Sequence, residues 1–108
     1  NNPLITLPKR LLDTENVYHL FPILVAEGKR DALHNYLEQN GVGSVIHYPI
    51  PPHKQECYAK ERWNTPWLSL PITERLANEE LSIPVSPCLT QKQSVYVVDL
   101  LNDLGVKE

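Results

Sequence analysis

The side chains most capable of chemistry lie close together, in the stretch from His47 to Tyr58. Two imidazoles, two phenols, an amide and a lysine fall within these twelve residues, around three prolines. Proline restricts the backbone and lowers the entropy that a loop loses when it is ordered, while the other side chains donate and accept hydrogen bonds. The stretch is therefore typical of a preorganised polar site.

Three other interpretations of the same stretch stay open. In the first, His47 and Tyr48 only end a strand and cover the core, and the polar residues after them are solvated. In the second, His47, His53 and Cys57 bind zinc, although five and then three intervening residues fit no familiar zinc pattern. In the third, Cys57 is a nucleophile activated by a histidine, which requires a contact that sequence does not reveal.

The elements before and within this stretch follow from hydrophobic patterning. Val17–Val25 is apolar and rich in β-favouring residues, which predicts a strand, with Pro22 at an edge or a bulge and not in a central strand. Gly28–Asn40 has helical periodicity and Gly41 is placed to end that helix. Val45–Tyr48 predicts a second strand that the prolines terminate. The predicted apolar face of the helix consists of Ala32, Leu33, Tyr36 and Leu37.

Further helices are predicted in the second half. They cover His53–Arg62, Ile72–Leu81 with Thr73 as N-cap, and a last helix opened by a Thr90/Gln93 capping box. Ser82–Pro87 is predicted to be extended between prolines. The last helix should bury Val97, Leu100, Leu101 and Leu104 and end at Gly105. Strands separated by helices predict an α/β domain of the α+β type, with a small sheet covered on one side by helices.

Several polar and aromatic residues outside the cluster receive structural assignments. The charged runs 74–75 and 78–80 are predicted to be a solvated helix face. His19 and His34 are predicted to lie at the surface or at an edge. Trp63 and Trp67 are expected either to pack the following loop or to face a neighbouring domain.

Length and composition limit the class of protein. A chain of 108 residues supports one domain, assigned here to residues 1–108. The net charge of -3, without a run of basic residues, argues against nucleic-acid binding, and no apolar stretch is long enough for a membrane span. Two cysteines without Cys-x-x-Cys spacing favour reduced thiols and the cytoplasm. The absence of methionine suggests a piece of a longer protein.

Four blocks in order resemble the C-terminal part of the DegT/DnrJ/EryC1/StrS family of fold type I aminotransferases. The blocks are the segment 17–22, the helix that ends at glycine, the sequence His-Tyr-Pro-Ile-Pro-Pro-His-Lys-Gln at 47–55, and Leu-Pro-Ile-Thr-Glu-Arg at 70–75 leading to 81–90. The resemblance implies the small domain of such an enzyme, with a mostly antiparallel sheet.

The resemblance also implies a function. Such enzymes transfer an amino group, usually from glutamate, through pyridoxal phosphate to a keto sugar linked to a nucleotide, in nucleotide-sugar and polysaccharide biosynthesis. The 47–55 block looks most like enzymes that aminate the 3-keto position of a dTDP-linked 6-deoxyhexose. The family usually forms homodimers. Its Schiff-base lysine and phosphate cradle have no counterpart here, so the fragment is expected to lack cofactor-binding and catalytic residues and to be inactive alone.

By this resemblance, His47, Tyr48, His53 and Gln55 are predicted to bind the sugar nucleotide. A rival role is that they brace the loop against the large domain or a dimer partner. A stand-alone interaction module that uses Trp63 and Trp67 to bind another protein is one alternative for the whole chain. A family relative that acts on another sugar carbon, or that serves in dehydration or regulation, is a second alternative.

Overall fold

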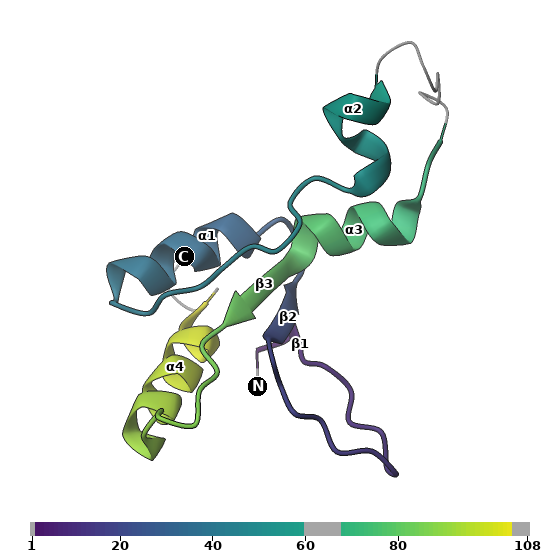
Figure 1. Ribbon diagram of the computed structural model, residues 1–108. Helices are drawn as coiled ribbons and strands as arrows, with labels where there is room; N and C mark the ends of the chain where they lie inside the picture. Colours follow the sequence, from purple (N-terminus) through teal and green to yellow (C-terminus); the bar gives the residue numbers. More distant parts are fainter. Residues whose placement is uncertain (1, 60–67, 105–108) are drawn as a thin grey trace.

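A three-stranded antiparallel sheet forms the centre of the computed structural model, which describes residues 2–59 and 68–104. The strands are β1 (Ile5–Thr6), β2 (Phe21–Val25) and β3 (Glu80–Ile83), and they lie side by side in chain order (Figure 1). The predicted α/β class with a small antiparallel sheet is confirmed.

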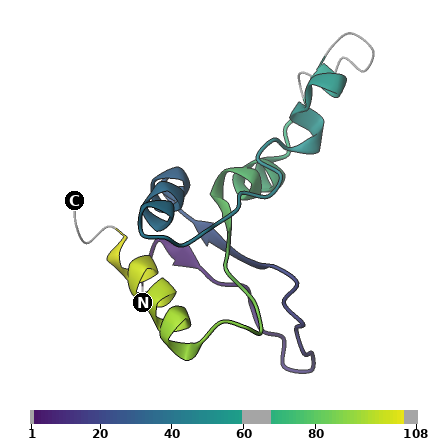
Figure 2. The same ribbon diagram turned by 60° about the vertical axis from the view of Figure 1, so that its left-hand side comes forward.

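The helices divide into a group that covers the sheet and a group that leaves it. Helices α1 (Arg30–Gln39) and α4 (Gln91–Asp103) contribute side chains to the core of the sheet. The 3-10 turn η1 (Pro52–Lys54), α2 (Glu56–Ala59) and α3 (Pro71–Glu79) project from it as an arm (Figure 2). The predicted polar stretch lies on this arm.

The core forms on one face of the sheet. Ile23 and Val25 are two residues apart in β2 and therefore share a face, and Leu81 of β3 is the partner of Ile23 across the ladder. All three are fully buried against Leu33 and Leu37 of α1. Helix α4 closes the same cluster with Val97, Leu100 and Leu101. The prediction that helices cover one side of the sheet is confirmed.

The end of α1 and the start of α4 lie where the sequence predicts them, whereas α1 begins at Arg30 and α4 ends at Asp103. Gly41 follows α1 with a φ of 73°, in the left-handed region that glycine adopts without strain. The Thr90 hydroxyl accepts the Gln93 N–H, and the Gln93 side chain accepts the Thr90 N–H, which completes the predicted capping box of α4. Leu104 packs partly buried against the core, whereas Gly105 lies outside the described residues.

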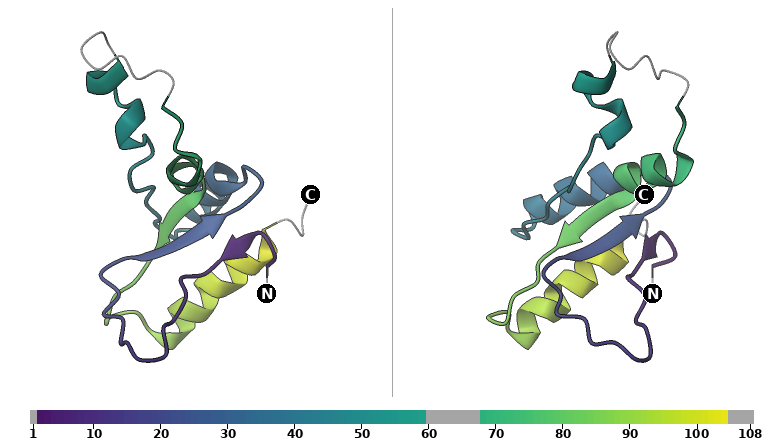
Figure 3. Two further views of the ribbon diagram at one scale, coloured as in Figure 1. Left: turned by 90° about the vertical axis from the view of Figure 1, so that its right-hand side faces the viewer. Right: turned by 45° about the vertical axis from the view of Figure 1, so that its right-hand side comes forward.

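The N-terminal segment lies beside the end of α4 (Figure 3). The Asn2 amide donates to the carbonyls of Leu101 and Leu104 at 2.9 and 2.8 Å, where the helix has carbonyls without helical partners. This contact places the two-residue β1, which the sequence analysis did not identify, next to β2.

The predicted strand Val17–Val25 is too long, and the expectation that it is not central is wrong. The chain begins β2 only at Phe21, because Tyr18 has a φ of 47° and its ring stacks on Phe21 with centroids 5.2 Å apart. Pairing with β1 and β3 makes β2 the central strand. Pro22 is accommodated because β1 reaches only Leu24 and Val25.

The missing N–H of Pro22 costs no ladder hydrogen bond. Pro22 is the partner of Ser82, but the N–H and C=O of Ser82 both bond to Val45 on the other side of β3. The pair Pro22/Ser82 is therefore a non-hydrogen-bonded pair, in which the backbone of Pro22 points away from β3. On the other side of β2, β1 ends at Thr6 opposite Leu24, so no strand of the described residues pairs with Pro22 there.

The predicted strand Val45–Tyr48 is wrong beyond its first residue. Val45 forms an isolated bridge with Ser82, with N–O distances of 3.0 and 2.8 Å. Continuing this ladder would pair His47 with the backbone of Glu80. The His47 N–H instead bonds to the Glu80 carboxylate, and Tyr48 turns the chain with a φ of 56°.

The two helices predicted in the arm need correction. His53–Arg62 is split into η1 and α2, because Gln55 is extended with a ψ of 146°, and residues 60–62 lie outside the described residues. Ile72–Leu81 begins one residue earlier, at Pro71, with Leu70 as N-cap and not Thr73. Glu80 and Leu81 belong to β3 and not to the helix, and β3 also contains the first two residues of the predicted extended segment.

Candidate functional site

His47 and Tyr48 line an open cavity of about 240 Å³ at the junction of the arm and the sheet. Tyr48 is 81% exposed, so its phenol is available to a ligand. Loop residues form one wall of the cavity, and α3 together with the start of β3 forms the other. The remaining lining residues are Pro51, Pro52, Thr73, Leu76, Ala77 and Glu80.

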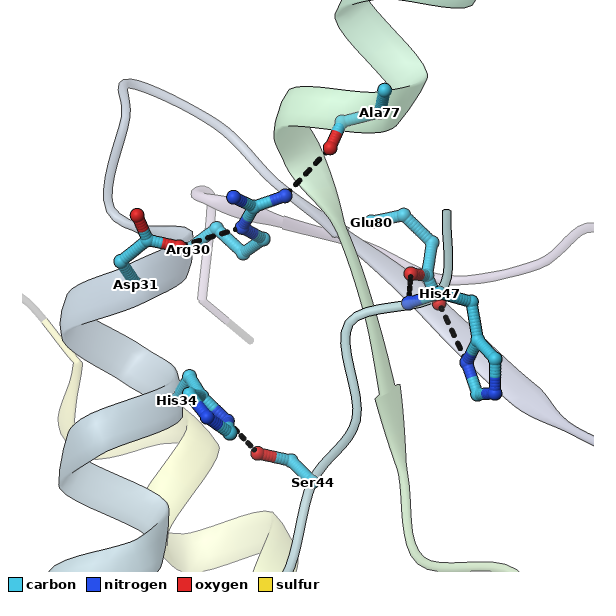
Figure 4. A network of polar contacts seen from close by, with 7 residues as sticks. All are labelled: Arg30, Asp31, His34, Ser44, His47, Ala77 and Glu80. Atoms are coloured by element: carbon cyan, nitrogen blue, oxygen red, sulfur yellow. Dashed lines mark hydrogen bonds and ion pairs between the residues drawn. The ribbon is translucent and has the colours of Figure 1, made fainter. Parts of the chain in front are cut away.

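The Glu80 carboxylate holds His47 by two routes. Its Oε2 accepts the His47 backbone N–H at 2.8 Å, and its Oε1 accepts the Ser82 hydroxyl at 2.7 Å. The Ser82 oxygen in turn lies 3.0 Å from His47 Nδ1. Figure 4 shows the His47 ring beside Glu80, with its second nitrogen turned away from the carboxylate. The position and rotation of this imidazole are thus determined by β3.

His53 is held by a second carboxylate, that of Glu74 in α3. The His53 side chain is only 6% exposed, and its Nε2 lies 2.9 Å from Glu74 Oε1. Lys54 Nζ donates to Glu74 Oε2 at 2.7 Å, and the Leu70 N–H donates to Oε1 at 3.1 Å. Hydrogen bonds from Lys54 first, and then from His53 and Leu70, lower the pKa of Glu74 from 4.5 to about 2.

The prediction that Glu74 and Glu80 are merely solvated helix residues is wrong. Their side chains are 24% and 16% exposed, and each binds one of the predicted site histidines. In the sequence these residues lie in a run of charges typical of a surface helix. No local sequence pattern distinguishes them from surface carboxylates, because their histidine partners lie 21 and 33 positions away in the chain.

Of the four predicted site residues, the structure brings only His47 and Tyr48 to this cavity. His53 is buried against Glu74, and its Nδ1 has no hydrogen-bond partner among the described residues. Gln55 is exposed at the end of η1. That any of the four binds substrate stays a prediction.

The zinc and thiolate alternatives receive no support from the geometry. Residues 2–59 and 68–104 contain no group of three or more His, Cys, Asp or Glu residues able to hold a metal ion. Cys57 and Cys88 are free, exposed thiols.

Within residues 2–59 and 68–104, no helix has the length and apolar character of a membrane span. Trp63 and Trp67 lie outside the described residues.

Other polar contacts fix the arm to the rest of the domain (Figure 4). Arg30 Nη1 of α1 donates to the Ala77 carbonyl near the end of α3 at 2.6 Å, and Arg30 Nε donates to Asp31 at 2.8 Å. His34 is half-buried, with Nδ1 2.7 Å from the Ser44 hydroxyl, whereas His19 is exposed as predicted. The contact between Arg30 and Ala77 thus joins α1 to the α3 wall of the cavity.

Comparison with known proteins identifies the chain's family. The model of the DegT/DnrJ/EryC1/StrS aminotransferase family matches residues 2–102. The chain belongs to this family. The match covers all three strands and nearly the whole of α4, so the family resemblance carried by the four sequence blocks is confirmed for the domain as a whole.

Individual members of the DegT/DnrJ/EryC1/StrS family share both sequence and fold with the chain. The dTDP-3-amino-3,6-dideoxy-alpha-D-galactopyranose transaminase of Aneurinibacillus thermoaerophilus is 39% identical over 96% of this chain and 27% of its own length. The crystal structure of S. venezuelae DesV in complex with a ketimine intermediate superposes with a TM-score of 0.81 at 36% identity, over 94% of this chain and 26% of DesV.

A third relative bears on the cofactor of the family. The crystal structure of NtdA from Bacillus subtilis with bound cofactor PMP superposes with a TM-score of 0.75 at 30% identity, and covers 92% of this chain and 22% of NtdA. The chain spans about a quarter of the length of the relatives it matches.

Proposed function

We propose that this chain is the C-terminal small domain of a pyridoxal phosphate-dependent aminotransferase. The enzyme would transfer an amino group to a keto sugar linked to dTDP, in nucleotide-sugar biosynthesis. The observation that carries the proposal is the family match across residues 2–102, together with the likeness to sugar transaminases at 36–39% identity. A domain of about a quarter of those relatives supplies part of a site and not the whole.

The described residues do not fit the cofactor itself. Pyridoxal phosphate enzymes need a lysine amine and a phosphate cradle, but the cavity beside His47 is lined by no lysine. The one lysine on the arm that the structure describes, Lys54, donates its amine to Glu74. We therefore assign no catalytic step to these residues and place the cofactor on polypeptide beyond this chain.

The role that suits the cavity is to position the sugar nucleotide. The Tyr48 hydroxyl and the His47 ring offer hydrogen bonds at an open wall, and the prolines around them limit the entropy lost when a ligand orders the loop. The proposal keeps His53 and Gln55 as ligand contacts of the same loop, although both lie outside this cavity and His53 anchors the loop to α3. For the full protein we further propose that glutamate is the amino donor, that the enzyme forms a homodimer and that it is located in the cytoplasm.

The test uses the full polypeptide that contains this chain. Incubated with pyridoxal phosphate, glutamate and a dTDP-linked 3-keto-6-deoxyhexose, it should yield the amino sugar, detected by mass spectrometry. Tyr48→Phe should raise KM for the sugar nucleotide about tenfold, the value of one hydrogen bond. Tyr96→Phe removes the same hydroxyl from α4, where it bonds to the Asn40 carbonyl, and should leave KM unchanged. A protein that binds the cofactor and aminates no such sugar contradicts the proposal.

A further inference from the structure

The series of hydrogen bonds from Glu80 through Ser82 to His47 determines which ring nitrogen of His47 carries the proton. A carboxylate only accepts hydrogen bonds, so the Ser82 hydroxyl proton points at Glu80 Oε1, 2.7 Å away. With its proton directed at Glu80, the Ser82 hydroxyl can only accept a hydrogen bond from His47 Nδ1, which lies 3.0 Å from its oxygen. Nδ1 must therefore be the donor of that bond, and the neutral ring carries its proton there.

The opposite nitrogen consequently offers a lone pair. Nε2 of His47 has no hydrogen-bond partner among the described residues, and the side chain is 32% exposed at the cavity shared with Tyr48. Glu80 lines the same cavity and adds negative charge. A phosphate oxygen would be repelled by both groups, whereas a hydroxyl or an ammonium group would be attracted.

We infer that Glu80 is a positioning residue that acts through Ser82 to hold His47 as the Nδ1–H tautomer, so that Nε2 accepts a hydrogen bond from a hydroxyl or amine of the ligand and not from its phosphates. The assignment of the ligand rests on the proposed function, because it places the sugar of a sugar nucleotide at this cavity. The assignment of the tautomer rests on the hydrogen bonds alone.

The tautomer is tested by NMR on protein labelled with ¹⁵N at histidine. Long-range ¹H–¹⁵N spectra at about pH 8, well above the usual pKa range of histidine, distinguish a protonated ring nitrogen from one with a free lone pair. The wild-type His47 ring should be protonated at Nδ1 and not at Nε2. A His47 ring protonated at Nε2, alone or together with Nδ1, overturns the inference without any variant.

Glu80→Gln should reverse the tautomer. The amide has one accepting oxygen, which the His47 N–H would occupy, and its NH₂ group would donate to Ser82. The Ser82 proton is then free to bond to His47 Nδ1, which moves the ring proton to Nε2. Glu79→Gln makes the same change one residue earlier, outside the cavity, and should leave the wild-type tautomer. An unchanged tautomer in folded Glu80→Gln protein contradicts the positioning role.

The ligand is tested with dTDP and dTDP-glucose as probes, by calorimetry on the full polypeptide. His47→Ala should weaken dTDP-glucose binding about tenfold and leave dTDP binding unchanged, because the lost hydrogen bond is to the sugar. Equal weakening of both probes, or of neither, overturns the ligand assignment. Failure of amino transfer with the tautomer and the probe affinities as expected would overturn the proposed function alone.

Discussion

Nε2 of His53 lies 2.9 Å from Oε1 of Glu74, although the two residues are 21 positions apart in the chain. This contact ties the far end of the proline-rich loop to the first turns of α3, as Glu80 ties the near end to β3 through His47. Two carboxylates from one short helix-to-strand segment thus hold the whole 47–54 loop.

Glu74→Gln should loosen the far end of the loop without unfolding the core. The amide keeps the size of the side chain but loses the charge that attracts Lys54 and one of the oxygens that accept hydrogen bonds. Amides of η1 and α2 should exchange with deuterium roughly tenfold faster, while those of α1 and β2 stay protected. Glu79→Gln serves as the matched control, and equal exchange in the two variants would contradict the anchoring role.

Acid should release the same anchor over a defined pH range. The pKa of Glu74 is lowered in the folded protein to about 2 from 4.5, chiefly by Lys54. A lowered pKa means that the carboxylate's stabilising effect is complete above pH 4.5 and is lost as the pH falls toward about 2. The measurement is a ¹³C titration of the Glu74 carboxyl by NMR. A midpoint near 4.5 would show that the contacts with Lys54 and His53 do not form in solution.

Local patterns were sufficient to predict the elements whose causes are local. The Thr90/Gln93 box, the left-handed Gly41 and the apolar spacing of Leu33 and Leu37 each act within a few residues, and the structure contains all of them. The strand β1 is different, because two residues are too few to show a period and their pairing with Leu24 and Val25 depends on distant contacts. Such an element is specified by tertiary packing.

The candidate site could be predicted only in part for the same reason. The composition of the 47–58 stretch identified His47 and Tyr48, which the structure places at one cavity. The charged neighbours of Glu74 and Glu80 in the sequence indicate a solvated helix face. Their histidine partners lie 21 and 33 positions away in the chain. Periodicity carries no information about such distant pairs.

Truncation of the core should cost far more than truncation of the surface. Leu37→Ala removes a fully buried side chain that packs between α1 and the sheet, and should lower the free energy of unfolding by about 2–5 kcal/mol. Leu12→Ala makes the identical change at a fully exposed position and should alter it by less than about 0.5 kcal/mol. Urea unfolding followed by circular dichroism measures both variants. Similar midpoints for the two would contradict the assigned core.

A crystal structure of the full polypeptide with dTDP-glucose tests most directly whether the proline-rich loop binds the sugar nucleotide. We expect a sugar hydroxyl within about 2.7–3.2 Å of His47 Nε2, with the Tyr48 hydroxyl also in contact with the ligand and the Glu80 and Glu74 contacts intact. A sugar nucleotide bound with no atom in contact with His47 or Tyr48, while the loop packs against protein alone, would contradict this expectation.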